Sequence, residues 1–63
     1  MSEITKTLEN ISEQLVDAIY DAEKFNQGNS SAGTRVRKAM QNIKSLAQSV
    51  RLEVQAEKNG VPA

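Results

Sequence analysis

Apolar side chains recur every three or four residues in two long stretches of the chain, and this spacing places them on one face of an α-helix. Gly28 separates the stretches and can take the left-handed conformation with which helices often end. Ser2 can cap the first helix, and Asn29, Ser30 or Ser31 can cap the second. The sequence therefore predicts an all-α chain, with helices at residues 3–26 and 31–58, a turn at 27–30 and a short tail at 59–63.

So short a turn makes the two helices antiparallel neighbours, and the predicted fold is a single-domain helical hairpin over residues 1–63. Two helices cover only one side of each other's apolar face, and a chain of 63 residues buries little surface by itself. A second copy of the chain can cover the apolar surface that the hairpin leaves exposed. We therefore expect a homodimer with coiled-coil packing, built as a four-helix bundle. Its expected core residues are Leu8, Ile11, Leu15, Ile19, Met40, Ile43, Leu46 and Val50.

Small residues near the predicted turn allow the helices to approach closely there, and they are Ala18, Ala22, Ala32, Ala39 and Ala47. Gly33 lies in the first turn of the second helix, where glycine costs about 1 kcal/mol relative to alanine. Close approach of the other helix, or of a phosphate group, would justify that cost. Of the two aromatic residues, Phe25 continues the apolar face and is expected in the core, whereas Tyr20 lies off that face.

The composition excludes several classes of function. The chain has no cysteine and no histidine, so it lacks disulfides, the commonest transition-metal ligands and the usual general base of an enzyme. Its carboxylates lie on an exposed helical row without the desolvation that catalytic carboxylates need, and we expect no enzyme, cofactor or metal. No apolar run approaches the roughly 18 residues of a membrane span, and residues 1–6 do not resemble a signal peptide. We expect a cytoplasmic protein.

Charges of opposite sign are sorted along the chain, although they sum to zero. Residues 1–23 hold six acids and one lysine, whereas residues 24–51 hold six bases and no acid. Four of the acids are spaced four residues apart and form a slowly winding row on the first helix: Glu9, Glu13, Asp17 and Asp21. This sorting indicates either pairing between the two halves or an anionic partner for the basic half.

The strongest candidate for such a binding site is the hairpin tip, by which we mean residues 24–38. Lys24, Arg35, Arg37 and Lys38 gather there, although cations at a helix N-terminus oppose the helix dipole. Arginine can hold phosphate oxygens with two parallel hydrogen bonds, and small residues before Arg35 allow close approach. The predicted nucleic-acid contacts are Lys24, Arg35, Arg37, Lys38, Lys44 and Arg51.

Internal ion pairing is the competing interpretation. Arg37, Lys44, Arg51 and Lys58 recur every seven residues beside the apolar face, where the flanking charges of coiled coils pair with another helix. If the acids of the first helix neutralise the cations of the tip in the same way, the tip is a solubilising surface and no site remains for nucleic acid.

Several segments resemble the chlamydial histone-like nucleoid protein family. They are Ala22-Glu23-Lys24, Gly28-Asn29, the stretch from Ala32 to Ala39 containing Arg35-Val36-Arg37-Lys38, Ile43-Lys44-Ser45-Leu46-Ala47, Arg51 with Glu53, and Ala56-Glu57-Lys58. The resemblance implies a DNA-associated, linker-histone-like protein of the nucleoid, with Lys24, Arg35, Arg37 and Lys38 as candidate contacts. Chlamydial members also carry a long basic tail that is thought to supply most DNA condensation, and these 63 residues resemble the helical core alone.

We therefore expect a histone-like, DNA-binding protein that contacts the phosphate backbone of double-stranded DNA without reading its sequence. The alternative is a structural or adaptor protein, for example in a phage particle or an assembly complex, whose helices join a bundle with an unlike partner. A basic amphipathic helix on an anionic membrane is a weaker alternative, because the second helix lacks tryptophan and has modest apolar bulk.

Overall fold

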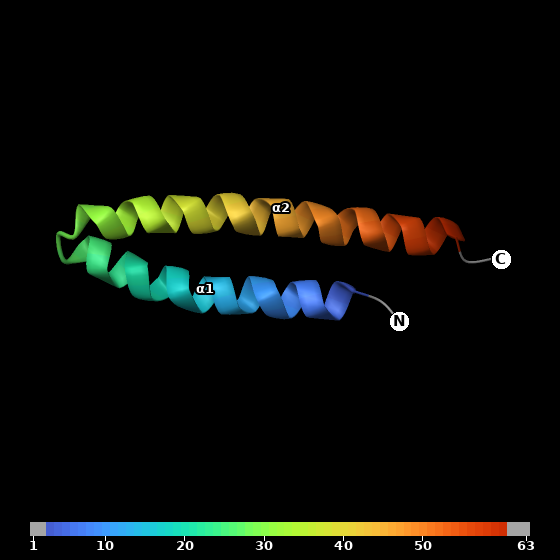
Figure 1. Ribbon diagram of the computed structural model, residues 1–63, viewed down its shortest axis with the longest axis horizontal. Coiled ribbons are helices and arrows are strands. Elements are labelled where there is room, and N and C mark those ends of the chain that lie inside the picture. Colours follow the sequence, from blue (N-terminus) through green and yellow to red (C-terminus); the bar gives the residue numbers. More distant parts are fainter. Residues whose placement is uncertain (1–2, 61–63) are drawn as a thin grey trace.

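The structure is a computed structural model that describes the backbone of residues 3–60 and the side chains of residues 3–58. It consists of two helices, α1 (Ile4–Asn26) and α2 (Ser30–Gly60), which lie side by side and antiparallel (Figure 1). The predicted all-α hairpin is confirmed. Helix α2 begins one residue earlier than predicted and includes residues 59 and 60, which the prediction gave to the tail. The predicted cap Ser2 and residues 61–63 lie outside the described residues.

A Schellman motif ends α1 and forms the turn. The amide of Asn29 donates to the carbonyl of Lys24 at 3.1 Å, and the amide of Gly28 donates to the carbonyl of Phe25 at 3.0 Å. Gly28 has a φ of 102°, in the left-handed region that favours glycine. These local bonds satisfy carbonyls at the end of α1 and reverse the chain within three residues, from Gln27 to Asn29.

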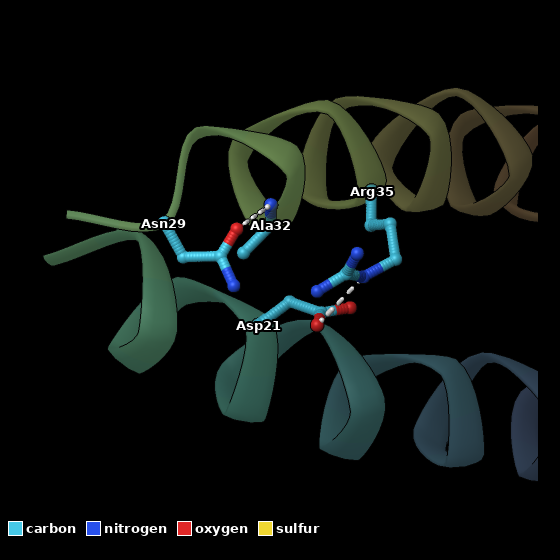
Figure 2. Close-up of polar contacts among 4 residues, drawn as sticks. All are labelled: Asp21, Asn29, Ala32 and Arg35. Atoms are coloured by element: carbon cyan, nitrogen blue, oxygen red, sulfur yellow. Dashed lines mark hydrogen bonds and ion pairs between the residues drawn. The ribbon is translucent and has the colours of Figure 1, made fainter. Parts of the chain in front are cut away.

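Asn29 caps the start of α2, because its side-chain Oδ1 accepts a hydrogen bond from the amide of Ala32 at 3.2 Å (Figure 2). We expect Asn29→Ala to lower the free energy of unfolding by about 1 kcal/mol, the usual contribution of such a cap. Chemical denaturation followed by circular dichroism at a fixed protein concentration measures it. The matched control Ser31→Ala, at an exposed neighbouring position, should change stability by only a few tenths of a kcal/mol. Equal effects of the two substitutions would contradict this assignment.

The start of α1 is held by a residue of the other helix. The amide of Glu3, the N-cap residue, donates to Oε2 of Glu53 at 3.3 Å, and no side chain of α1 itself caps that end. A carboxylate at a helix N-terminus also complements the helix dipole. This contact places the beginning of α1 beside Glu53, so that the last two turns of α2 extend beyond α1 (Figure 1).

The seam between the helices is closest near the turn. Ala18 and Ala32 are the buried residues of the described part of the chain, with exposed fractions of 5% and 0%. Half-buried residues continue the seam at a spacing of three and four toward the open end. On α1 they include Ile4, Thr7, Ile11 and Gln14, and on α2 they include Val36, Ala39, Ile43, Leu46 and Val50. The small residues near the turn thus allow close packing there, as predicted.

The eight predicted core residues of a dimer fall into two groups. Ile11, Ile43, Leu46 and Val50 are half-buried in the seam of the single hairpin. The other four are exposed to solvent, with exposed fractions of 50% for Leu8, 42% for Leu15, 61% for Ile19 and 42% for Met40. A single hairpin therefore covers half of the set and leaves the other half available to a partner.

The two sides of the seam differ in polarity. At 100° per residue, one side carries Leu8, Leu15, Ile19 and Ala22 of α1 together with Gly33, Met40, Ala47 and Val54 of α2, and we call it the apolar flank. The opposite side, the polar flank, carries Gln14, Asp17 and Asp21 of α1 together with Arg35, Lys38 and Asn42 of α2. The acidic row winds by about 40° for every four residues, so it reaches the polar flank only at its Asp17 and Asp21 end.

Candidate nucleic-acid interface

Arg35 and Asp21 form an ion pair across the polar flank. Nε of Arg35 donates to Oδ1 of Asp21 at 3.0 Å, and this bond joins α2 to α1 close to the turn at Gln27 to Asn29 (Figure 2). The side chain of Arg35 is 49% exposed, whereas that of Asp21 is 17% exposed. The expectation that Arg35 is free for an external anion is therefore corrected. Its charge is partly neutralised within the hairpin, because an acid of the first helix faces it directly.

Lys24 lies over the ring of Tyr20, with Nζ at 4.9 Å from the ring centroid. Lys24 and Tyr20 are one turn apart along α1, and a cation–π contact of this kind contributes about 0.5 to 1 kcal/mol at an exposed site. It leaves the ammonium charge uncompensated, because an aromatic ring carries no net charge. Tyr20 itself is 60% exposed, so it serves here as a support for Lys24 rather than as part of the core.

Arg37 and Lys38 are exposed, and neither has an ion pair among the residues that the structure describes. They point in different directions, because adjacent residues of a helix are 100° apart. Lys38 lines a polar recess of about 220 Å³ together with Arg35 and Asp17. Arg37 lines an apolar recess of about 420 Å³ beside Phe25, and both cations line a third recess of about 460 Å³. The tip cations are therefore spread around the end of the hairpin, with Arg37 and Lys38 as neighbours on α2.

The remaining predicted contacts lie along α2, away from the tip. Lys44 and Arg51 are exposed, and so is Lys58. In the part of the chain that the structure describes, the ion pair between Arg35 and Asp21 is the one salt bridge. The competing interpretation of internal pairing thus accounts for one of the three bases at the start of α2, and it leaves Arg37 and Lys38 available.

Gly33 allows the close approach that its position predicted, and its neighbour is the aromatic ring of Phe25. A Cβ atom on residue 33 would lie 2.6 Å from Cδ1 and 2.7 Å from Cε1 of that ring. No other residue type would fit without moving the ring. Phe25 is nevertheless 53% exposed, so the prediction that it is a core residue is wrong for the single hairpin.

Two features of the site were not identified in the sequence. The partner of Arg35 is one such feature: the acidic row was recognised, but nothing in the spacing distinguished Asp21 from Asp17. The recess beside Phe25 is the other. The sequence contained an indication of this recess. A glycine inside a helix lowers its stability, and a bulky residue close to it, such as Phe25, can be the reason for its presence.

Comparison with protein families gives a match of residues 5–60 to the family described as histone H1-like protein Hc1. Comparison with curated proteins and with solved structures gives no significant match. The matched residues include both helices, the turn and every cation of the tip. In the described residues, neither helix contains a stretch that is apolar enough to cross a membrane.

Proposed function

The chain belongs to the histone H1-like protein Hc1 family, and on this basis we propose that it binds the phosphate backbone of duplex DNA through its hairpin tip. The binding is independent of base sequence, and the role is structural rather than catalytic. A protein with this role is associated with the nucleoid. Lys24, Arg37 and Lys38 supply the principal contacts, and Arg35 contributes when it leaves Asp21.

The observation that supports this proposal most strongly is the pair of exposed cations at the start of α2. Arg37 and Lys38 have no carboxylate partner among the described residues, and the sequence has no acid between residues 24 and 51. Two neighbouring bases with no acid beside them raise the local positive potential. A polyanion lowers the free energy of such a cluster, whereas water and salt only screen it.

A homodimer is the second part of the proposal. The apolar flank supplies Leu8, Leu15, Ile19 and Met40, which are about half exposed, so that covering each stabilises a contact by about half of the roughly 1.5 to 3 kcal/mol for complete burial. A single tip that makes three or four phosphate contacts is expected to bind weakly, in the range of about 10⁻⁴ to 10⁻⁶ M. Two tips on one particle increase the binding strength, provided that one DNA molecule can reach both.

Competition among duplexes tests whether the binding ignores sequence. Fluorescence anisotropy of a labelled duplex is measured at low salt while unlabelled duplexes of the same length and unrelated sequences displace it. We expect the midpoints to agree within about threefold, because phosphate contacts carry no sequence information. A preference of about a hundredfold or more for one sequence would contradict backbone binding, and the absence of any duplex binding would contradict the proposal as a whole.

Replacement of Asp21 tests the part played by the ion pair. We expect Asp21→Asn to raise duplex affinity about eightfold at 100 mM salt, since Arg35 becomes available for one further phosphate contact. The loss of stability should stay below about 1 kcal/mol, because Arg35 is half exposed and such pairs are weak. Anisotropy titration measures the affinity. Glu9→Gln makes the same change of charge near the other end of α1 and should have a smaller effect. A decrease of affinity in Asp21→Asn would instead mean that Asp21 orients Arg35 for binding.

A further inference from the structure

An apolar recess opens on the apolar flank at the hairpin tip, about one helical turn beyond Ile19 and Met40. Its volume is about 420 Å³, within the size range of small-molecule sites. The end of α1 and the start of α2 both contribute residues to its lining. Its apolar lining includes Phe25, Gly33 and Val36, and its polar lining includes Ser30, Thr34 and Arg37.

Phe25 is held at the wall of this recess and does not project from the tip. The absence of a Cβ on Gly33 gives room for the edge of the ring against α2. With the ring in that place, more than half of Phe25 stays accessible, at an exposed fraction of 53%. An aromatic ring in that position can receive a flat apolar group, but it cannot insert itself between the stacked bases of a duplex as a projecting wedge does.

The charge beside the recess restricts the chemistry of its occupant. Arg37 lines the recess and has no ion pair among the described residues, while the hydroxyl groups of Ser30 and Thr34 can donate hydrogen bonds. The site thus brings an aromatic ring, a guanidinium without an ion pair and neutral donors to the lining of one recess. A nucleotide with an exposed base has the matching groups, namely a flat aromatic face and a phosphate one sugar away.

We infer that this recess binds one unpaired base of single-stranded nucleic acid, with Phe25 as the stacking partner and Arg37 as the phosphate contact. The inference rests on the proposed binding of nucleic acid by the tip and adds a preference to it. Stacking on an aromatic side chain contributes a factor of about 5 to 150 in affinity per base, and any base can supply it. The tip therefore binds single strands, frayed ends and gaps more tightly than intact duplex.

The test uses the full chain with a single-stranded oligonucleotide that contains 2-aminopurine, whose fluorescence falls when the base stacks. Anisotropy is measured in parallel for that strand and for a duplex of the same length. We expect Phe25→Leu to bind the single strand at least about fivefold more weakly than wild type and to lose the quenching. Its duplex affinity should stay within about twofold, because leucine keeps the apolar bulk and every cation remains.

Gly33→Ala is a second variant that removes the recess without removing the aromatic ring. Its Cβ takes the place of the ring edge, so Phe25 must swing away, while alanine favours the helix by about 1 kcal/mol. We expect weaker binding of the single strand with the fold retained by circular dichroism. Leu52→Ala, at an exposed apolar position of α2 outside the recess, serves as the control and should leave single-strand binding unchanged.

Several outcomes would overturn the inference while leaving duplex binding in place. They are equal affinity of wild type and Phe25→Leu for the single strand, an equal loss in the control Leu52→Ala, and a loss of self-association in Phe25→Leu without any change in binding. The last result would identify a second copy of the chain as the occupant of the recess. A wild-type chain that binds neither strand form would overturn the proposed function as well, so the two failures are distinguishable.

Discussion

Replacing Arg37 and Lys38 together by glutamine is expected to weaken duplex binding about 60-fold at 100 mM salt. Each neutralised phosphate contributes about 0.9 to the slope of log affinity against log salt, so two lost contacts make the slope shallower by about 1.8. If both proteins bind equally at 1 M salt, this difference gives the stated factor at 100 mM. Anisotropy titrations of one duplex at several salt concentrations measure both quantities.

The fold of this double variant should be intact. Glutamine is a good helix former, and removing two of the four cations of the tip relieves their repulsion of one another. Its melting temperature should therefore equal or exceed that of wild type. The matched control replaces Lys6 and Lys58, two exposed lysines away from the tip, and makes the same change of net charge. A control that loses as much affinity as the tip variant would show that overall charge, and not the tip, controls binding.

Leu15→Glu is expected to convert the proposed dimer to a monomer. Leu15 is 42% exposed in the single hairpin and lies in the middle of the apolar flank, so the charge interferes only when a second copy covers it. A two-fold interface contains the substitution twice. Because each copy loses an apolar contact and would have to bury a carboxylate, the dissociation constant should rise at least about a hundredfold. Sedimentation velocity at micromolar concentration measures the change.

The neighbouring residue provides the control for this prediction. Val16 is 64% exposed and lies 100° further round α1, away from the apolar flank, so Val16→Glu should leave the dimer unchanged. We expect the melting temperature to fall in Leu15→Glu and to stay unchanged in Val16→Glu. The reason is that the described part of the single hairpin has only two buried residues, Ala18 and Ala32. A wild-type chain that sediments as a monomer with full helicity would contradict the dimer, and equal effects of the two substitutions would contradict its assigned surface.

The hairpin could be predicted from the sequence because its determinants are local. Apolar spacing predicted both helices, Gly28 predicted the turn, and Asn29 was one of three candidate caps, since each of these signals acts within a few residues. The contact of Glu53 with the amide of Glu3 could not be predicted in this way. It joins residues fifty positions apart and depends on the register between the helices.

The residues that each helix turns toward the other were harder to predict from the sequence than the helices themselves. The apolar face of α1 is wider than one neighbouring helix can cover, and the hairpin centres its seam on Ala18 and the half-buried polar residues Thr7 and Gln14. Leu8 and Leu15 are left outside as a result. The sequence pattern shows which residues share a face of α1. Close packing of small residues near the turn determines which part of that face α2 covers.

The same limit applies to the candidate site. The sorting of charge along the chain identified the tip cations, because a cluster of bases at a helix N-terminus is conspicuous in the sequence. The pairing of Arg35 with Asp21 depends on which flank each residue occupies, and that follows from the seam. Phe25 became part of a recess rather than the core for the same reason.

The salt dependence of duplex binding by the wild-type chain tests the central claim most directly. With three to four phosphate contacts at a tip, the slope of log affinity against log salt should lie between about −2.7 and −3.6 for each tip that binds. Affinity should then fall about 40- to 150-fold between 50 and 200 mM salt. An affinity that is unchanged over this range would contradict binding of the phosphate backbone by the tip cations.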